Sequence, residues 1–332
     1  MNTIVEKLTE KTLSLAKELI EKEELVAFPT ETVYGLGALA TSELAIKKVY
    51  EVKGRPSDNP LIVHVHKDYN LDLLVENAYG GYAEKIAKAF LPGPLTMVYK
   101  SKGTVAKSLS CGLDTLAIRI PASNEAQTFL RYVNQPIAAP SANISKHISP
   151  VTANHVYQDF NGKIPLILDG GKCVGGIEST VMDVTGDYPI ILRKGLITAD
   201  MVRKIVGKCE YAEEKTLAQV KSPGMKYSHY TPNCSTALFE RSELEKALEL
   251  YEELINNGKS AVFLVDGEIF DKLPKATPKL LLGRTDEEMA SRLYDLLHVG
   301  EKYDCIIAFK LNVNSELMMS VNNRFSKAFY KD

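Results

Sequence analysis

One polar turn sets the strongest constraint on how this 332-residue chain can fold. The segment FPTETVYGLG, residues 28–37, follows a run that is typical of a β-strand, and its proline and glycines require a fixed turn. The turn is crowded with polar side chains, those of Thr30, Glu31, Thr32 and Tyr34. Such a turn lowers stability unless it holds something, so the segment predicts a binding site.

Two cations follow about twenty residues later, in the segment KGRPSDNPLIVHV. Lys53 and Arg55 stand at the end of a predicted helix that Ser42 can cap, where positive charge also suits the helix dipole. Asn59 and His64 come next, the histidine on a predicted buried strand. Hydroxyl groups that face cations indicate a site for an anionic ligand.

Strand-like and helical segments alternate along the whole chain. Residues 9–22 carry apolar positions at helical spacing and lead into a strand at 25–28, so we expect the chain to begin with a helix. Further strands are expected in the segments LIVHVH, LTMVYK, TLAIRI, PIAAPS, PLILDG, TVMDV and PIILRKG. Beyond residue 241, helices and strands alternate in the manner of a small parallel βαβ domain. The pattern predicts an α/β fold with a large mixed sheet.

The character of the sequence changes between residues 207 and 235. The segment VKSPGMKYSHYTPNCS has two prolines, a glycine and no periodicity, so it is interpreted as an extended linker. Its tyrosines, histidine and lysines leave two readings open, an inert spacer or a cover over a ligand. We therefore predict a first domain over residues 1–207, a linker over 208–235 that covers the active site, and a second domain over 236–332.

Composition excludes several classes of protein. The formal net charge of −2 argues against a dedicated nucleic-acid coat or a polybasic membrane binder. The N-terminus lacks the features of a signal peptide and no apolar run is long enough to cross a bilayer, so we expect a cytoplasmic protein without membrane contact. Five widely spaced cysteines without a CxxC pair predict free thiols. No metal-binding side chains are assigned.

The usual phosphate-binding loops do not occur in this sequence. The Gly258-Lys259-Ser260 triplet resembles the end of a Walker loop, but Glu253 stands where the first glycine should be. No GxGxxG follows a strand either. If phosphates bind here, separate cations and hydroxyl groups must hold them.

Several strand ends offer such groups. Arg119 lies in an apolar predicted strand, and two readings stay open for it: a residue on a solvated face or a ligand contact. Ser141 and Asn143 follow Pro140, and by themselves they indicate only a turn. Ser179 follows a glycine pair that permits close approach to a ligand, and Arg193 ends another strand.

No candidate nucleophile with a neighbouring base emerges. Glu31 is either a base or a turn acceptor, and we favour the turn acceptor. Positioning and charge neutralisation, as in phosphoryl or nucleotidyl transfer, fit better.

The motifs together resemble one family, the YrdC-type threonylcarbamoyl-AMP synthases. The resemblance covers about residues 9–235 and is carried by FPTETVYGLG, KGRPSDNPLIVHV, PGPLTMVYK, LAIRIP, APSANISKHISPVT, GGIESTVMDV, ILRKG and SPGMKYSHYTP. The C-terminal region, which ends in NNRFSKAF, resembles the extra domain of the two-domain form. This resemblance implies a twisted mixed-sheet YrdC-like catalytic domain with a concave basic cleft, and a small Rossmann-like α/β domain after it.

The resemblance also implies an activity. Members make L-threonylcarbamoyladenylate and pyrophosphate from L-threonine, bicarbonate or CO2, and ATP, with Mg²⁺ accompanying the ATP. The product feeds the t6A modification of adenosine 37 in tRNAs that read ANN codons. The implied partners are therefore the downstream t6A transferase machinery and, through a weak contact, tRNA.

Site residues follow from the family motifs. The L-threonine site would consist of Thr32, His64, Arg119, Ala139 and Ser179, with Arg119 pairing with the carboxylate. Lys53 and Arg55 would be catalytic and would hold the ATP phosphates. The remaining ATP contacts would be Asn59, Thr115, Ser141, Asn143, Ser149 and Arg193, together with Tyr227 and His229 of the linker.

Two other functions stay open at this point. One is an RNA-binding module that uses the same cleft, for which the overall acidic balance is unfavourable. The other is a carbamoyl-transferring relative that uses carbamoyl phosphate, against which the complete set of threonine-site residues argues.

Overall fold

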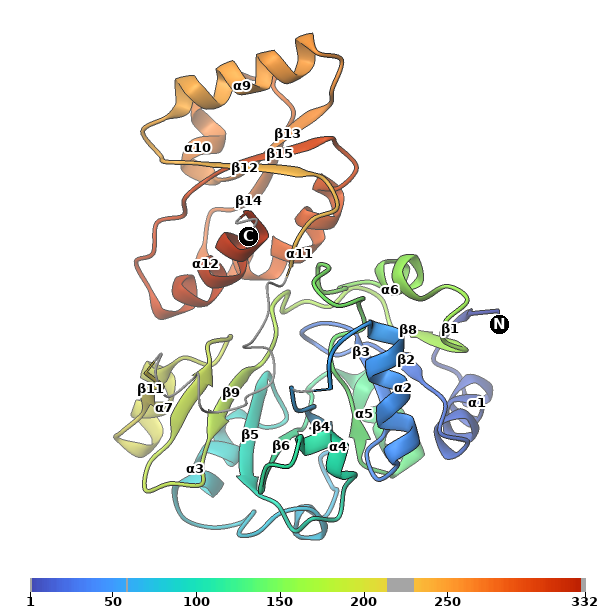
Figure 1. Ribbon diagram of the computed structural model, residues 1–332. Helices are drawn as coiled ribbons and strands as arrows, with labels where there is room; N and C mark the ends of the chain where they lie inside the picture. Colours follow the sequence, from blue (N-terminus) through green and yellow to red (C-terminus); the bar gives the residue numbers. More distant parts are fainter. Residues whose placement is uncertain (1, 58, 214–229, 330–332) are drawn as a thin grey trace. The chain divides into compact units, whose positions relative to one another are not determined.

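The computed structural model describes residues 2–57, 59–213 and 230–329 (Figure 1). The chain divides into two compact units. The N-terminal unit comprises Met1–Ser145 and Ser149–Tyr227, and the C-terminal unit comprises Lys146–Ile148 and Ser228–Asp332. The domain boundaries drawn from sequence stay a prediction, and Tyr227 and His229 lie outside the described residues.

The N-terminal unit is built on a large mixed sheet, as predicted. In the described residues this sheet has the strand order β1-β8-β2-β3-β7-β4-β6-β5-β9-β10-β11. The strands are β1 (Ile4–Lys7), β2 (Val26–Phe28), β3 (Gly35–Leu39), β4 (Val63–His64), β5 (Leu95–Lys100), β6 (Thr115–Arg119), β7 (Ile137–Ala138), β8 (Leu166–Asp169), β9 (Thr180–Asp183), β10 (Ile190–Arg193) and β11 (Glu210–Tyr211). Parallel pairs such as β4–β6 alternate with antiparallel pairs such as β5–β6. The sheet is therefore mixed in direction.

Helices cover this sheet. They are α1 (Glu10–Glu21), α2 (Glu43–Lys53), the 3-10 helix η1 (Leu71–Leu73), α3 (Gly81–Phe90), α4 (Lys107–Ser110), α5 (Asn124–Val133), α6 (Ala153–Phe160) and α7 (Ala199–Val206). The apolar stripe of α1 is buried with Phe28 and Phe129, as its spacing predicted. Ser42 caps α2 by accepting a hydrogen bond from the Ala45 backbone N–H at 3.1 Å.

One local prediction was wrong, and two were right only in part. The chain begins with the strand β1, which pairs in parallel with β8, and not with a helix; its exposed side chains show no alternation that would have revealed it. The second half of the 28–37 turn continues as β3, antiparallel to β2. The segment LIVHVH contains only the short strand β4, although the Val65 N–H still donates to the Arg119 carbonyl at 3.1 Å and the Ile62 carbonyl accepts from the Ala139 N–H at 2.9 Å.

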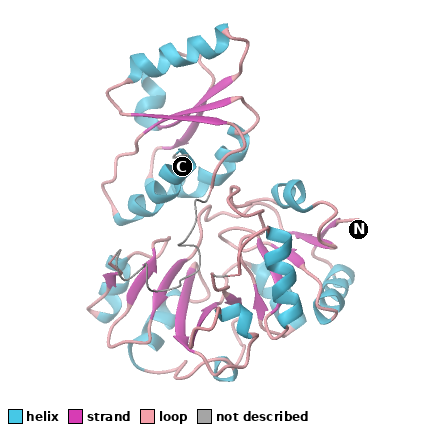
Figure 2. Cartoon of the chain, viewed as in Figure 1, coloured by secondary structure: helices cyan, strands magenta, loops and turns pink. Residues whose placement is uncertain are grey.

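The C-terminal unit is a separate α/β layer structure. Its sheet has the order β12-β15-β13-β14, and all three described pairs are parallel, which confirms the predicted parallel arrangement. The elements are β12 (Ser235–Phe239), α9 (Leu244–Asn256), β13 (Ala261–Asp266), α10 (Gly267–Lys272), β14 (Lys279–Gly283), α11 (Asp286–Gly300), β15 (Cys305–Phe309) and α12 (Glu316–Phe329). Helices α9 and α10 lie on one side of this sheet, and α11 and α12 on the other (Figure 2). The helix α12 was not predicted from the sequence.

No helix among the described residues is long and apolar enough to cross a membrane.

Candidate active site

A row of polar side chains crosses three neighbouring strands of the large sheet. The strand register places His64 of β4 beside Arg119 of β6, and Arg119 beside Thr96 of β5. Residues directly opposite each other in adjacent strands point to the same face of a sheet. All three side chains are buried, so this row lies in the interior of the unit and not on a solvated face. The solvated-face reading of Arg119 was therefore wrong.

Arg119 is paired with Glu31 of the polar turn. The Arg119 Nη2 atom lies 2.7 Å from Glu31 Oε1, and the two side chains are only 5% and 12% exposed. Within the described residues, the buried atoms Arg119 Nε and Glu31 Oε2 have no hydrogen-bond partner. The favoured role of the Glu31 side chain as a turn acceptor was wrong, because its carboxylate accepts from Arg119 across 88 positions of sequence.

Buried polar atoms without partners are costly. The pair therefore presents one spare donor and one spare acceptor, suited to a small ligand with both charges.

The polar turn is held by its own hydroxyl groups and by a glycine loop. Thr30 Oγ1 accepts hydrogen bonds from the backbone N–H groups of Thr32 and Val33 and lies 2.9 Å from Thr32 Oγ1. The Gly175 N–H donates to the Glu31 carbonyl at 2.7 Å. A side chain at Gly175 would bring Cβ to 2.8 Å from that same oxygen, so only glycine allows this approach. The GGIEST loop thus fixes the backbone of Glu31.

His64 is a neutral acceptor in this row. Burial, with a further contribution from the charge of Arg119, lowers the pKa of His64 to about 3. His64 Nδ1 lies 3.2 Å from the Ile62 carbonyl oxygen. Because a carbonyl oxygen only accepts, Nδ1 carries the proton and Nε2 keeps its lone pair. His64 therefore offers an acceptor to a ligand hydroxyl or ammonium group.

This shift predicts a specific loss of stability in acid. Between pH 6.5 and the folded pKa of about 3, the unfolded chain binds a proton at His64 that the folded chain does not, so stability falls as the pH falls. From pH 6.5 to about 4.5 the wild type should lose about 2–3 kcal/mol more than His64→Gln. Urea unfolding of both proteins at the two pH values measures the difference. Equal losses would show that His64 does not titrate in this way.

Ser179 lies at the end of the same row. Its Oγ atom is 2.8 Å from Thr96 Oγ1, and Arg193 donates from Nε and Nη2 to the Ser179 carbonyl oxygen at 3.1 and 2.9 Å. The structure thus brings Ser179 and Arg193 together. Sequence reasoning missed Thr96, whose signal was a single hydroxyl inside the apolar run LTMVYK.

Lys53 connects the end of α2 with the Ser141 loop. Its Nζ atom donates to the backbone carbonyl oxygens of Ser141 and Asn143, both at 2.6 Å, and the side chain is only 3% exposed. Burial, together with the charge of Arg55, lowers the pKa of Lys53 to about 7, while Asp159 opposes this change. In this structure Lys53 therefore holds the loop that carries the predicted Ser141 and Asn143 contacts.

The other predicted residues lie in the same unit at different places. Arg55 Nη2 donates to the carbonyl oxygen of Asn59 at 3.1 Å. Ser149 Oγ donates to Glu178, a buried carboxylate that sequence reasoning missed. Ala139 is buried against the position of Gly35. Thr115 begins β6, four residues before Arg119, which is about 13 Å along an extended strand.

No group of three or more His, Cys, Asp or Glu side chains in the described parts of the chain could hold an ion. The five cysteines are free thiols, as predicted.

Fold and site together define a class of protein: an α/β enzyme scaffold whose fixed cations, hydroxyl groups and neutral histidine could hold a small charged ligand. The chain belongs to the threonylcarbamoyl-AMP synthase family. Residues 18–195 match the Sua5/YciO/YrdC family, described as "Telomere recombination", and residues 197–329 match the family "Threonylcarbamoyl-AMP synthase, C-terminal domain".

Relatives match over almost the whole chain. The chain is 39% identical over 327 residues to the threonylcarbamoyl-AMP synthase of Pyrococcus abyssi, which covers 97% of this chain and 95% of that protein. It is 38% identical over 322 residues to the threonylcarbamoyl-AMP synthase of Bacillus subtilis, covering 95% and 92%. The crystal structure of P. abyssi Sua5 complexed with L-threonine matches with a TM-score of 0.86 and 38% identity, covering 99% of this chain and 97% of that one.

Proposed function

We propose that this protein condenses L-threonine, bicarbonate or CO2, and ATP into L-threonylcarbamoyladenylate and pyrophosphate. The product would serve the t6A modification of adenosine 37 in tRNAs that read ANN codons, through a downstream transferase. The observation that carries the proposal is the buried Arg119–Glu31 pair, in which one donor and one acceptor have no partner among the residues that the structure describes. The relatives named as threonylcarbamoyl-AMP synthases support it, as does the related structure with L-threonine.

The pair suits an amino acid in its zwitterionic form. Arg119 keeps Nη2 on Glu31 and turns its free edge, including Nε, to the carboxylate of threonine. Glu31 offers Oε2 to the ammonium group. His64 accepts the threonine hydroxyl at Nε2, and Thr32, Ala139 and Ser179 line the pocket. Glu31 thus joins the threonine-site residues predicted from sequence.

The chemistry needs positioning and charge neutralisation. The threonine amine loses its proton and its nitrogen attacks the carbon of CO2, which forms a carbamate and releases a second proton to solvent. A carbamate oxygen then attacks the α-phosphorus of ATP, and the bond between that phosphorus and the bridging oxygen breaks as pyrophosphate leaves. Positive charge at Lys53, Arg55 and Arg193 would stabilise the transferring phosphoryl group.

Groups on several loops would form the ATP-binding part of the site. Lys53 would position the loop of Ser141 and Asn143, while Arg55, Asn59, Ser149 and Arg193 hold phosphates and ribose. Thr115 lies at the opposite end of β6 from Arg119. At that distance from the threonine site it would contact the nucleoside end of an extended adenylate. Tyr227 and His229 of the linker would close over the nucleotide.

Mg²⁺ would enter this site on the phosphates of ATP. Magnesium usually keeps several waters and is held largely by substrate phosphates, so a protein cage is not required. The ion would supply charge neutralisation at the phosphates.

Pyrophosphate release tests the proposal directly. With ATP and Mg²⁺, release should require both threonine and bicarbonate, and mass spectrometry should detect threonylcarbamoyladenylate. Omission of either co-substrate should reduce release to the background rate. Release that is independent of threonine, or a product formed from carbamoyl phosphate instead of bicarbonate, would contradict the assignment.

A further inference from the structure

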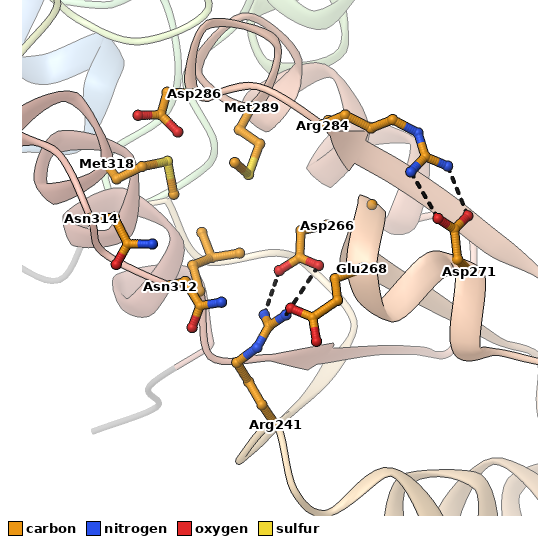
Figure 3. Close-up of a pocket in the computed structure, with 13 residues that line it drawn as sticks. Arg241, Asp266, Glu268, Asp271, Arg284, Asp286, Met289, Asn312, Asn314 and Met318 are labelled. Atoms are coloured by element: carbon orange, nitrogen blue, oxygen red, sulfur yellow. Dashed lines mark hydrogen bonds and ion pairs between the residues drawn. The ribbon is translucent and has the colours of Figure 1, made fainter.

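The C-terminal unit carries its own cavity at a characteristic place in its sheet. The cavity has a volume of about 260 Å³ and lies at the carboxyl ends of the parallel strands (Figure 3). Its walls come from the last residues of β13 and β14, Asp266 and Gly283, and from the segments that follow β12 and β15, represented by Arg241 and Leu311.

Strand connections make this cavity a topological switch point. The neighbouring strands β13 and β15 are paired in parallel. The chain leaves β13 toward α10, which packs with α9 on one face of the sheet. It leaves β15 toward α12, on the face occupied by α11 (Figure 2). In open parallel sheets, ligands bind in the crevice that opens where adjacent strands send their connections to opposite faces.

Two glycines shape the wall. A side chain at Gly267 would place Cβ 2.8 Å from Arg284 Cγ, and one at Gly283 would place it 2.7 Å from the Met289 backbone nitrogen. Neither contact is compatible with a real Cβ atom. Because glycine has no side chain at these two positions, Arg284 and the first turn of α11 can approach the sheet closely. The cavity lies between them.

Both arginines that line the cavity are already paired with carboxylates. Arg241 is paired with Asp266 and Glu268, and Arg284 forms two 2.8 Å bonds with Asp271 (Figure 3). Asp286 adds a fourth carboxylate, so two arginines stand against four acidic groups. Phosphate and carboxylate ligands are therefore disfavoured here.

The remaining lining groups suit an uncharged ring. Met289, Met318 and Leu311 are at least about nine-tenths buried and form an apolar floor, and methionine sulfur contacts aromatic rings favourably. Asn312 and Asn314 are exposed residues of the cavity lining, and their side-chain amides offer paired donors and acceptors. Asp286 Oδ2 accepts from the Ser315 hydroxyl, and the carboxylate keeps further lone pairs that can accept from ligand hydroxyl groups.

We infer that this cavity is a binding site for a nucleoside without phosphate. The base lies on the methionine floor with its edge toward the asparagine amides, and the sugar hydroxyl groups face Asp286. The volume is slightly below the roughly 300–1,000 Å³ of sites for drug-sized ligands, which suits a molecule of nucleoside size. This inference stands independently of the proposed synthase activity.

Methionine methyl NMR of the full chain tests the inference. The protein is labelled at its methionine methyl groups, Met289→Leu and Met318→Leu assign the two signals, and adenosine, AMP and spermidine are titrated separately. Adenosine should shift both signals, and AMP should bind about tenfold more weakly at low salt because the carboxylates repel its phosphate.

Matched variants locate the binding. Asn312→Ala should weaken adenosine about fivefold, the value of one hydrogen bond, whereas Asn256→Ala on exposed α9 should leave it unchanged. Lys53→Met, in the other unit, should leave both methyl shifts intact even if it abolishes synthase activity. No shift with millimolar adenosine, equal binding of AMP, or a response to spermidine alone would overturn the inference.

Discussion

Replacement of Arg119 by alanine is expected to raise the KM for threonine about 100-fold or more while the KM for ATP changes little. The proposed carboxylate contact is a charge-assisted, bidentate pair in a buried row, and its loss corresponds to roughly 3 kcal/mol. Initial rates of pyrophosphate release at varied threonine and fixed ATP, and the converse, separate the two constants. Exposed Arg131→Ala, whose partner is Asp68 at the surface, is the matched control and should behave as wild type.

The same change should also reduce folding stability. Without Arg119 the nearly buried Glu31 carboxylate is left without its cation, and such a loss costs about 3–5 kcal/mol. The double variant Arg119→Ala/Glu31→Gln removes that unpaired charge. It should recover much of the stability but none of the threonine affinity, which separates a folding defect from a binding defect. Recovery of threonine affinity in the double variant would contradict the assignment of Arg119.

Lys53→Met should weaken ATP use about 30–100-fold and leave the threonine KM nearly unchanged. The replacement keeps the length of the side chain but removes both 2.6 Å bonds to the Ser141 and Asn143 carbonyl oxygens. Two bonds from a charged donor to buried acceptors account for a loss of about 2–3 kcal/mol. Lys47→Met, an exposed lysine of the same helix, is the control.

Binding of AMP, ADP and ATP to Lys53→Met distinguishes a role of Lys53 in positioning the Ser141 loop from direct contact of Lys53 with the phosphates. If Lys53 acts by holding the Ser141 loop, Lys53→Met should weaken AMP, ADP and ATP by similar factors, as measured by equilibrium binding. A penalty that grows from AMP to ATP would instead show that Lys53 binds the outer phosphates. Unchanged affinity for all three would remove Lys53 from the ATP site.

Local sequence patterns predicted individual helices and strands, but not which strands pair or which side chains meet. The apolar spacing of residues 9–22 and the capping Ser42 were sufficient for two helices, because both signals act over a few residues. β1 was missed since its exposed side chains carry no periodicity, and only its pairing with β8, 162 positions later, makes it a strand. A strand of this kind is stabilised by its neighbour and not by its own sequence.

The sequence by itself determined the α/β class, the parallel sheet of the second unit and the residue types of the candidate site. Short-range propensities and the quoted motifs carry that information. Only the tertiary structure decided that Glu31 faces Arg119, that Thr96 joins Ser179, and that Lys53 holds a loop. Each of these contacts joins positions more than 80 residues apart. A sequence pattern indicates which segments are apolar enough to be buried, whereas the path of the chain through the sheet decides whether a polar side chain such as Arg119 is buried and which charge or hydroxyl group it meets.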